Sequence, residues 1–200
     1  MRKLIMRSGH LEEIAQKRFS EHIEVVDRTR DSLSSIVVEA GKILAKALQQ
    51  ERTVFWAGNG GSAADSQHLA AELVGRFKHD RKALRSIALT TDSSILTCVS
   101  NDYSYDDIFS RQIEALGRKG DVFVGISTSG GSKNILRALH AAREIGVHTI
   151  AMLGKGGGEA IRVADCSIVI PSDSTARIQE THILVGHILC EVIETELGFG

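Results

Sequence analysis

The chain has 200 residues, of which 42% are apolar, and this is enough for one domain with a sizeable buried core. Its 24 basic and 25 acidic residues give a formal net charge of -1, which excludes the basic composition typical of nucleic-acid-binding proteins. No apolar run approaches the ~18 residues of a membrane-spanning helix, and the run near the start is too short for the core of a signal peptide.

The predicted elements begin with a helical segment at residues 1–50. From residue 11 onward this segment contains one glycine, Gly41, and no proline, and apolar side chains recur at helical spacing from Ile23 to Leu48. We expect two amphipathic helices, with a break near Asp31 and Ser32. The segment is predicted to belong to the same domain as residues 51–200 and to take part in oligomer packing.

Short apolar runs then alternate with longer helical patterns. Strands are predicted at 53–57, 86–89, 121–126, 147–153 and 167–170. Helices are predicted at 63–77, within 93–117, from about 132 to 145, and from about 176 to 197. Because the strands are apolar throughout, they indicate a parallel sheet covered by helices on both faces, an α/β fold. Its ligand site is expected beyond the carboxyl ends of the strands.

Two loops rich in glycine and serine follow predicted strands, at 58–62 and 127–132. The second, with sequence STSGGS, offers hydroxyls and backbone N–H groups at the start of a helix, where a phosphate dianion is favoured. It lacks the Gly-Lys-Ser/Thr ending of a Walker A loop and the Gly-x-Gly-x-x-Gly pattern of dinucleotide sites. The pattern favours a phosphate ligand, although a serine-capped turn without a ligand would have the same sequence.

Two helices carry candidate ligands for a divalent cation. His68 and Glu72 lie four residues apart, hence on one helical face, and could bind Zn²⁺, act as an acid–base pair, or form only a surface pair. Gln179 and His187 lie eight residues apart, a rise of roughly 12 Å, so one ion reaches both only from an irregular helix or with help from another chain. We therefore hypothesise a site at a subunit interface. His187 could also be an isolated core histidine.

The mixed-charge residues 76–82 are expected to form a solvated turn. The odd number and wide spacing of the cysteines indicate free thiols in a reducing compartment, and we expect a cytoplasmic protein. The three cysteines are Cys98, Cys166 and Cys190.

Together these motifs resemble the sugar isomerase (SIS) domain family, and within it the phosphoheptose isomerases. The resemblance extends over nearly the whole chain. Its matching segments are AGNGGSAADSQH at 57–68, AE at 71–72, LTTD at 89–92, NDY at 101–103, ISTSG at 126–130, RIQE at 177–180 and GHIL at 186–189.

The resemblance implies a flavodoxin-like five-stranded parallel sheet and a homotetramer with active sites between subunits. It implies an aldose–ketose isomerase that converts sedoheptulose 7-phosphate to D-glycero-D-manno-heptose 7-phosphate by acid–base proton transfer through an enediol. This reaction is the first step of ADP- or GDP-heptose biosynthesis, for lipopolysaccharide, capsule or S-layer glycans.

The resemblance also implies roles for individual residues. One Zn²⁺ per subunit would be held by His68, Glu72, Gln179 and His187, and Glu72 and His187 would be the acid–base residues. The implied substrate contacts are Asn59, Gly60, Gly61, Ser62, Glu72, Asp102, Ser127, Thr128, Ser129, Ser132 and Gln179. Some relatives carry aspartate immediately before Arg-Ile-Gln, where this chain has Ala176, so no role of that acid is carried over.

Two other functions stay open at this point. A non-enzymatic tetrameric relative of the same fold binds the replication initiator DnaA, but it lacks the complete ligand set that this chain retains. Other SIS domains sense sugar phosphates and are attached to DNA-binding domains, for which the segment before the first strand holds no basic cluster. We therefore expect a sugar phosphate as ligand, with neither nucleic acid nor membrane as partner.

Overall fold

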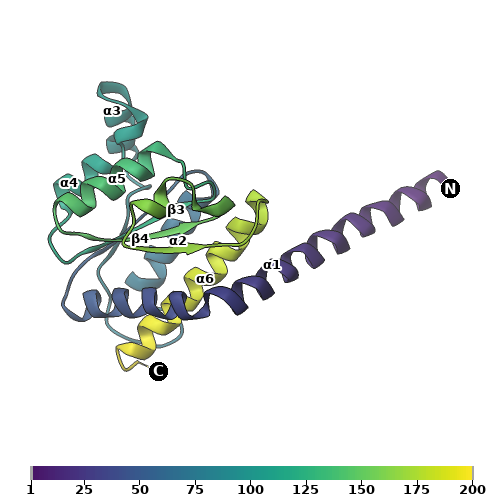
Figure 1. Ribbon diagram of the computed structural model, residues 1–200, viewed down its shortest axis with the longest axis horizontal. Helices are drawn as coiled ribbons and strands as arrows, with labels where there is room; N and C mark the ends of the chain where they lie inside the picture. Colours follow the sequence, from purple (N-terminus) through teal and green to yellow (C-terminus); the bar gives the residue numbers. More distant parts are fainter. Residues whose placement is uncertain (1, 200) are drawn as a thin grey trace.

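The computed structural model describes residues 2–199 and contains a sheet of five parallel strands (Figure 1). The strand order is β2-β1-β3-β4-β5, which is that of the flavodoxin-like doubly wound sheet. The predicted fold class is confirmed. The strands are β1 (Val54–Gly58), β2 (Ser86–Ala88), β3 (Val122–Ser127), β4 (His148–Leu153) and β5 (Cys166–Val169).

Helices cover both faces of the sheet, which is why the central strands are buried along their whole length. One face is covered by α1, α2 and α6 and the other by α3, α4 and α5 (Figure 1). Short 3-10 turns η1 (Tyr105–Asp107), η2 (Lys155–Gly157) and η3 (Ala160–Arg162) complete the connections. The helices are α1 (Arg2–Gln49), α2 (Gly61–Val74), α3 (Ser93–Asp102), α4 (Ser110–Leu116), α5 (Lys133–Glu144) and α6 (Thr175–Glu196).

Alternating strand side chains separate the interior into two cores. Trp56 and Val124 face α1, α2 and α6, whereas Phe55 and Phe123 face the opposite helices. All four side chains are at most 1% exposed. The sheet is therefore a rigid platform for the loops at its carboxyl edge.

The first helix is continuous, so the predicted break near Asp31 and Ser32 is wrong. The Ser32 hydroxyl donates a hydrogen bond to the carbonyl of Arg28, four residues earlier, which a serine can do without interrupting a helix. A polar pair in an amphipathic pattern is therefore weak evidence for a helix end.

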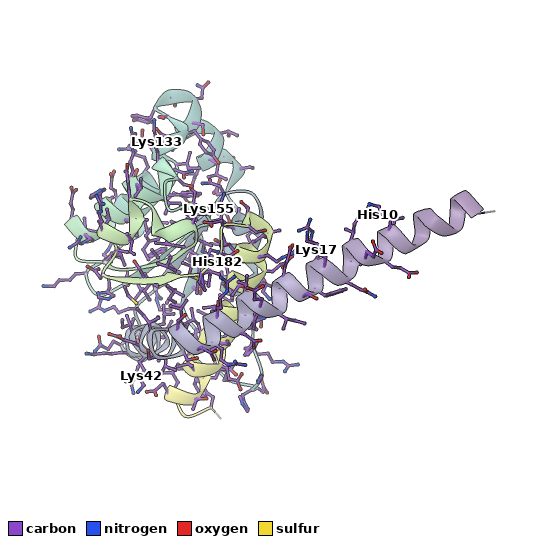
Figure 2. All side chains as sticks on the ribbon, turned by 45° about the vertical axis from the view of Figure 1, so that its right-hand side comes forward. His10, Lys17, Lys42, Lys133, Lys155 and His182 are labelled. Carbon is purple, nitrogen blue, oxygen red and sulfur yellow. The ribbon has the colours of Figure 1, made fainter. Side chains whose placement is uncertain are left out.

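The two halves of α1 have different surroundings. Val37 and Leu44 are buried in the core that α1 shares with α6. The other half projects from the body, and Figure 2 labels His10 and Lys17 along it. On this projecting half, Leu11 and Phe19 are 64% and 72% exposed. Within residues 2–199, no helix has both the length and the apolar character needed to cross a bilayer.

Two strand ends define the place where a ligand is expected. Chain order reverses at β1, whose neighbours are β2 on one side and β3 on the other. Gly58 at the end of β1 pairs with Ile126 near the end of β3. The loops after these two strands therefore begin side by side at the switch point, where doubly wound sheets bind ligands.

Candidate active site

The loop after β1 is tied to the helix after β3. The side-chain amides of Asn59 and Asn134 exchange two hydrogen bonds of 2.9 and 2.8 Å, and the Tyr105 hydroxyl donates to Asn59 Oδ1 at 2.9 Å. Gly60 follows with φ of 57°, a left-handed conformation that favours glycine. Ser62 is then buried in the first turn of α2. These contacts hold Asn59 against α5 and η1.

The serine-rich loop after β3 has a fixed inner part and an open outer part. Ser127 Oγ lies 3.0 Å from Ser132 Oγ and accepts the Gly130 N–H at 3.1 Å. Ser129 Oγ accepts the Gly131 N–H at 3.3 Å, and both of these residues are exposed. The half-buried Thr128 lies between these two parts. A set of hydroxyls and backbone N–H groups at the start of α5 suits a phosphate group.

A third loop packs directly against this one. The Ala160 N–H donates to the Gly130 carbonyl at 3.0 Å. Gly130 has φ of 65°, and a Cβ atom at this position would collide with the backbone of Gly157. Glycine at position 130 is therefore required both by conformation and by the close approach of η2.

Three side chains from α2 and α6 converge on one point. His68 Nε2 lies 2.8 Å from His187 Nε2 and 3.3 Å from Glu72 Oε1. One ligand atom from each of the three residues lies within 4.8 Å of the others. His187 is half-buried and in contact with His68, so it is not an isolated core histidine.

The donor atoms of this cluster fit a divalent cation. Two imidazole nitrogens and a carboxylate oxygen are ordinary Zn²⁺ ligands, and ligand atoms ~2.1 Å from a tetrahedral ion lie about 3.4 Å apart. The separation of 3.3 Å between His68 and Glu72 matches that spacing, and the two histidine nitrogens are closer at 2.8 Å. Two Nε2 atoms at this distance share either one proton or one cation, because two N–H groups would repel each other.

The fourth expected ligand, Gln179, contacts α2 about one helical turn before His68. It is about two turns before His187 on α6, and its amide packs against Gly61 and Asp65. The convergent His68, Glu72 and His187 are three of the four expected ligands, and a metal contact from Gln179 stays a prediction. The hypothesis that a second copy completes the site stays a prediction.

Asp65 is a site residue that the sequence did not single out. It is 8% exposed, and its Oδ2 atom has no hydrogen-bond partner among the described residues. Burial raises the pKa of Asp65, although the neighbouring Gln179 amide and His68 act in the opposite direction. The available signal was an acid on the inner face of a helix beside small and apolar residues.

Asp102 lies apart from these groups. It ends α3, which projects from the body in Figure 1, and its carboxylate accepts hydrogen bonds from Cys98 and Asn101. Among the described residues it has no hydrogen bond or ion pair with either loop. A substrate contact from Asp102 therefore stays a prediction. Ala176 is exposed in the first turn of α6.

The chain is similar in sequence to known proteins over most of its length. The SIS domain family model matches residues 19–154. A phosphoheptose isomerase of Sulfurimonas denitrificans is 52% identical over 167 residues, which are 84% of this chain and 86% of that protein.

Two solved structures are similar over comparable lengths. The phosphoheptose isomerase of Neisseria gonorrhoeae is 42% identical, with a TM-score of 0.88, over 92% of this chain and 99% of that one. A phosphoheptose isomerase from Francisella tularensis is 34% identical, with a TM-score of 0.89, over 92% and 97% of the two chains.

Proposed function

Because the chain belongs to the SIS domain family and, within it, to the phosphoheptose isomerases, we propose that it converts sedoheptulose 7-phosphate to D-glycero-D-manno-heptose 7-phosphate. It is a sugar-phosphate isomerase of heptose metabolism. The observation that carries the specific proposal is the convergence of His68, Glu72 and His187 at one point. The proposed reaction is the first step towards ADP- or GDP-heptose in the cytoplasm.

The loop at 127–132 would bind the phosphate of the substrate. Its serine hydroxyls and backbone N–H groups, some of which contact each other within the loop, would donate hydrogen bonds to an anion at the start of α5. Binding energy from this distant group can orient the reacting carbons without taking part in the chemistry. Asn59 lies between this loop and α2, where it can contact a sugar hydroxyl.

Glu72 and His187 would move the protons. Isomerisation removes a proton from the carbon next to the carbonyl and returns one to the neighbouring carbon, while a second proton moves between the oxygens. A carboxylate and an imidazole are suitable groups for both transfers at neutral pH. Glu72 Oε1 and His187 Nε2 both face His68, so they can act on adjacent atoms of one substrate.

We also propose that Zn²⁺ is held by His68, Glu72 and His187, with Gln179 as the fourth ligand. Because an atom that binds the ion cannot take a proton at the same time, Glu72 and His187 would exchange one use for the other during turnover. When bound, the ion would polarise the substrate carbonyl and stabilise negative charge on its oxygen. Metal analysis of the purified protein, before and after a chelator, tests this assignment. Zinc in near-stoichiometric amount, with activity lost on chelation and restored by Zn²⁺, would support it.

We further propose a homotetramer whose active sites lie between subunits. The projecting half of α1 exposes large apolar side chains, including Leu11, Phe19 and Ile23, and an apolar surface of this kind favours association. The exposed Asp102 could then reach a neighbouring site. Sedimentation analysis tests the assembly, and a monomer at micromolar concentration would contradict it.

An activity assay tests the reaction itself. Zn²⁺-loaded protein is incubated with sedoheptulose 7-phosphate and, in parallel, with six-carbon ketose phosphates, and products are identified by NMR. We expect the seven-carbon aldose phosphate as the product. A folded, zinc-loaded protein that converts no seven-carbon substrate would reject the proposal and favour a scaffold that binds DnaA, which a pull-down would detect.

A further inference from the structure

A buried ion pair joins the two helices that carry the convergent side chains. Arg81 Nε lies 2.9 Å from Glu194 Oε1, and the two side chains are 0% and 1% exposed. Arg81 follows α2 in the turn at 75–82, and Glu194 lies in the last turns of α6. The expectation that residues 76–82 form a solvated turn is therefore wrong for Arg81. A buried pair is stable only when its remaining polar atoms are also satisfied.

The other donor atoms of Arg81 form hydrogen bonds with carbonyl groups at the end of α2. Its Nη2 atom donates to the Glu72 carbonyl at 2.9 Å, and Nη1 donates to the Leu73 carbonyl at 2.9 Å. The last carbonyls of a helix have no partner within the helix, and a cation is favoured there by the helix dipole. The guanidinium group therefore caps the turn of α2 that carries Glu72.

Glu194 holds in place the segment that follows α2. Its carboxylate accepts the backbone N–H groups of Phe77, Lys78 and His79 at 3.1 to 3.2 Å. Burial alone would raise the pKa of Glu194, but these three donors and Arg81 together lower it, so the group is ionised at neutral pH. The turn after α2 is thereby attached to α6.

The attached turn places the Phe77 ring on His187. The two rings are stacked, with centroids 5.6 Å apart and an interplanar angle of 19°. The ring of His68 also lies near His187, edge-on, with centroids 5.1 Å apart and an interplanar angle of 73°. His187 is thus held between an aromatic ring on one side and its proposed co-ligand on the other.

We propose that Phe77 is a positioning residue for His187 and that the Arg81–Glu194 pair holds Phe77 in place. Phe77 offers no metal-binding or proton-transferring atom, so it acts only through the orientation of the imidazole. Groups behind a metal ligand commonly set its orientation and the affinity of the site. The proposal rests on the proposed function, because it concerns the geometry of the zinc and acid–base residues.

The first test compares two variants of Phe77. Phe77→Leu keeps an apolar side chain but removes the ring, and Phe77→Tyr keeps the ring. Zn²⁺ affinity is measured by competition with a chromophoric chelator, and the visible absorption of Co²⁺-substituted protein reports ligand geometry. We expect Phe77→Leu to weaken Zn²⁺ binding by about three- to tenfold, as loss of an aromatic pair would, and to shift the Co²⁺ band. Phe77→Tyr should keep the Zn²⁺ affinity and the Co²⁺ absorption band of the unsubstituted protein.

The second test concerns the ion pair. Arg81→Lys keeps the charge but loses the planar group that reaches two carbonyls at once. We expect faster hydrogen exchange of the amides at 77–79 in metal-free protein, together with weaker Zn²⁺ binding. Asp121→Asn is the matched control, since Asp121 is also buried, accepts the N–H groups of Thr53 and Arg118, and lies at the opposite end of β3. This control should lose stability without losing Zn²⁺ affinity.

The outcomes distinguish failure of the positioning role from failure of the proposed function. If Phe77→Leu binds Zn²⁺ and Co²⁺ as the unsubstituted protein does, Phe77 is not a positioning residue. If Arg81→Lys and Asp121→Asn lose equal stability and both keep full Zn²⁺ affinity, the ion pair has only a structural role. If the unsubstituted protein itself neither binds Zn²⁺ nor converts a heptose phosphate, the proposed function fails and the positioning role fails with it.

Discussion

The Nε2 atoms of His68 and His187 lie 2.8 Å apart, although 119 positions separate the two residues in the chain. The contact follows from how closely α2 and α6 approach. A Cβ atom at Gly186 would collide with the side chain of Leu69. These two residues directly adjoin the histidines in sequence, so a glycine in α6 brings both imidazoles within reach of each other.

Substitution of the proposed acid–base residues should abolish most turnover. Glu72→Gln and His187→Ala are each expected to lower kcat by a factor of about 10² to 10⁴, the usual contribution of a general acid or base. Steady-state kinetics on sedoheptulose 7-phosphate measures the effect, with circular dichroism to verify folding. Glu191→Gln, at an exposed acid on α6, is the control. Near-normal turnover in either variant would remove that residue from the mechanism.

Removal of the exposed hydroxyl of the serine-rich loop should weaken substrate binding. Ser129→Ala is expected to raise KM by roughly tenfold or more, because a hydrogen bond to a charged group contributes about 1.5–3 kcal/mol. The value of kcat should change little, since the phosphate is remote from the reacting carbons. Inhibition by inorganic phosphate should weaken in parallel. Ser32→Ala, on the exposed surface of α1, should leave both constants unchanged.

Two glycines with similar positive φ angles should respond differently to alanine. Gly130 and Gly156 have φ of 65° and 75°, but only at Gly130 would a Cβ atom collide with the neighbouring backbone. Gly156→Ala should cost about 1 kcal/mol for conformation alone, and Gly130→Ala about 3 kcal/mol once the collision is added. Thermal unfolding measures both. Equal losses would show that the contact between the two loops is not tight.

Stability should fall in mild acid because of one buried histidine. His182 lies in the body of the molecule (Figure 2), fully buried, with Nε2 2.9 Å from the Leu153 carbonyl. Burial lowers the pKa of His182 from 6.5 to about 4. Between pH 6.5 and pH 4 the histidine binds a proton in the unfolded chain but not in the folded one. The free energy of unfolding therefore falls by up to about 3 kcal/mol as the pH falls through this range.

The variant His182→Gln tests this dependence. Glutamine can still donate to the Leu153 carbonyl but does not titrate. Denaturant unfolding at several pH values between 6.5 and 4 should therefore give a shallower loss of stability than in the unsubstituted protein. An identical slope in the two proteins would mean that other groups cause the acid sensitivity.

Much of the fold could be predicted because it depends on local patterns. Apolar strands such as β3, each followed by a glycine-rich loop and a helix, determine the class of sheet and the edge at which the loops meet. The end of α2 was less predictable. Its helical pattern continues to residue 77, but the helix stops at Val74, where Arg81 caps it from beyond the turn.

From spacing alone the site was predictable only where its residues are close in sequence, and His187 was joined to His68 and Glu72 by the family resemblance. The spacing of His68 and Glu72 already places them on one helical face. Arg81 could not be distinguished from the charged residues around it, because its burial depends on Glu194, 113 positions away. The role of Phe77 likewise depends on a ring carried by another helix.

The proposed phosphate contact and the proposed proton transfers belong to separate elements of the fold. The serine-rich loop belongs to β3 and α5, whereas the convergent histidines and glutamate are borne by α2 and α6. If the proposed roles hold, removal of those three side chains would leave the proposed phosphate loop intact and convert an isomerase into a sugar-phosphate receptor. Evolution could thus recruit the same scaffold for signalling without rebuilding the ligand pocket.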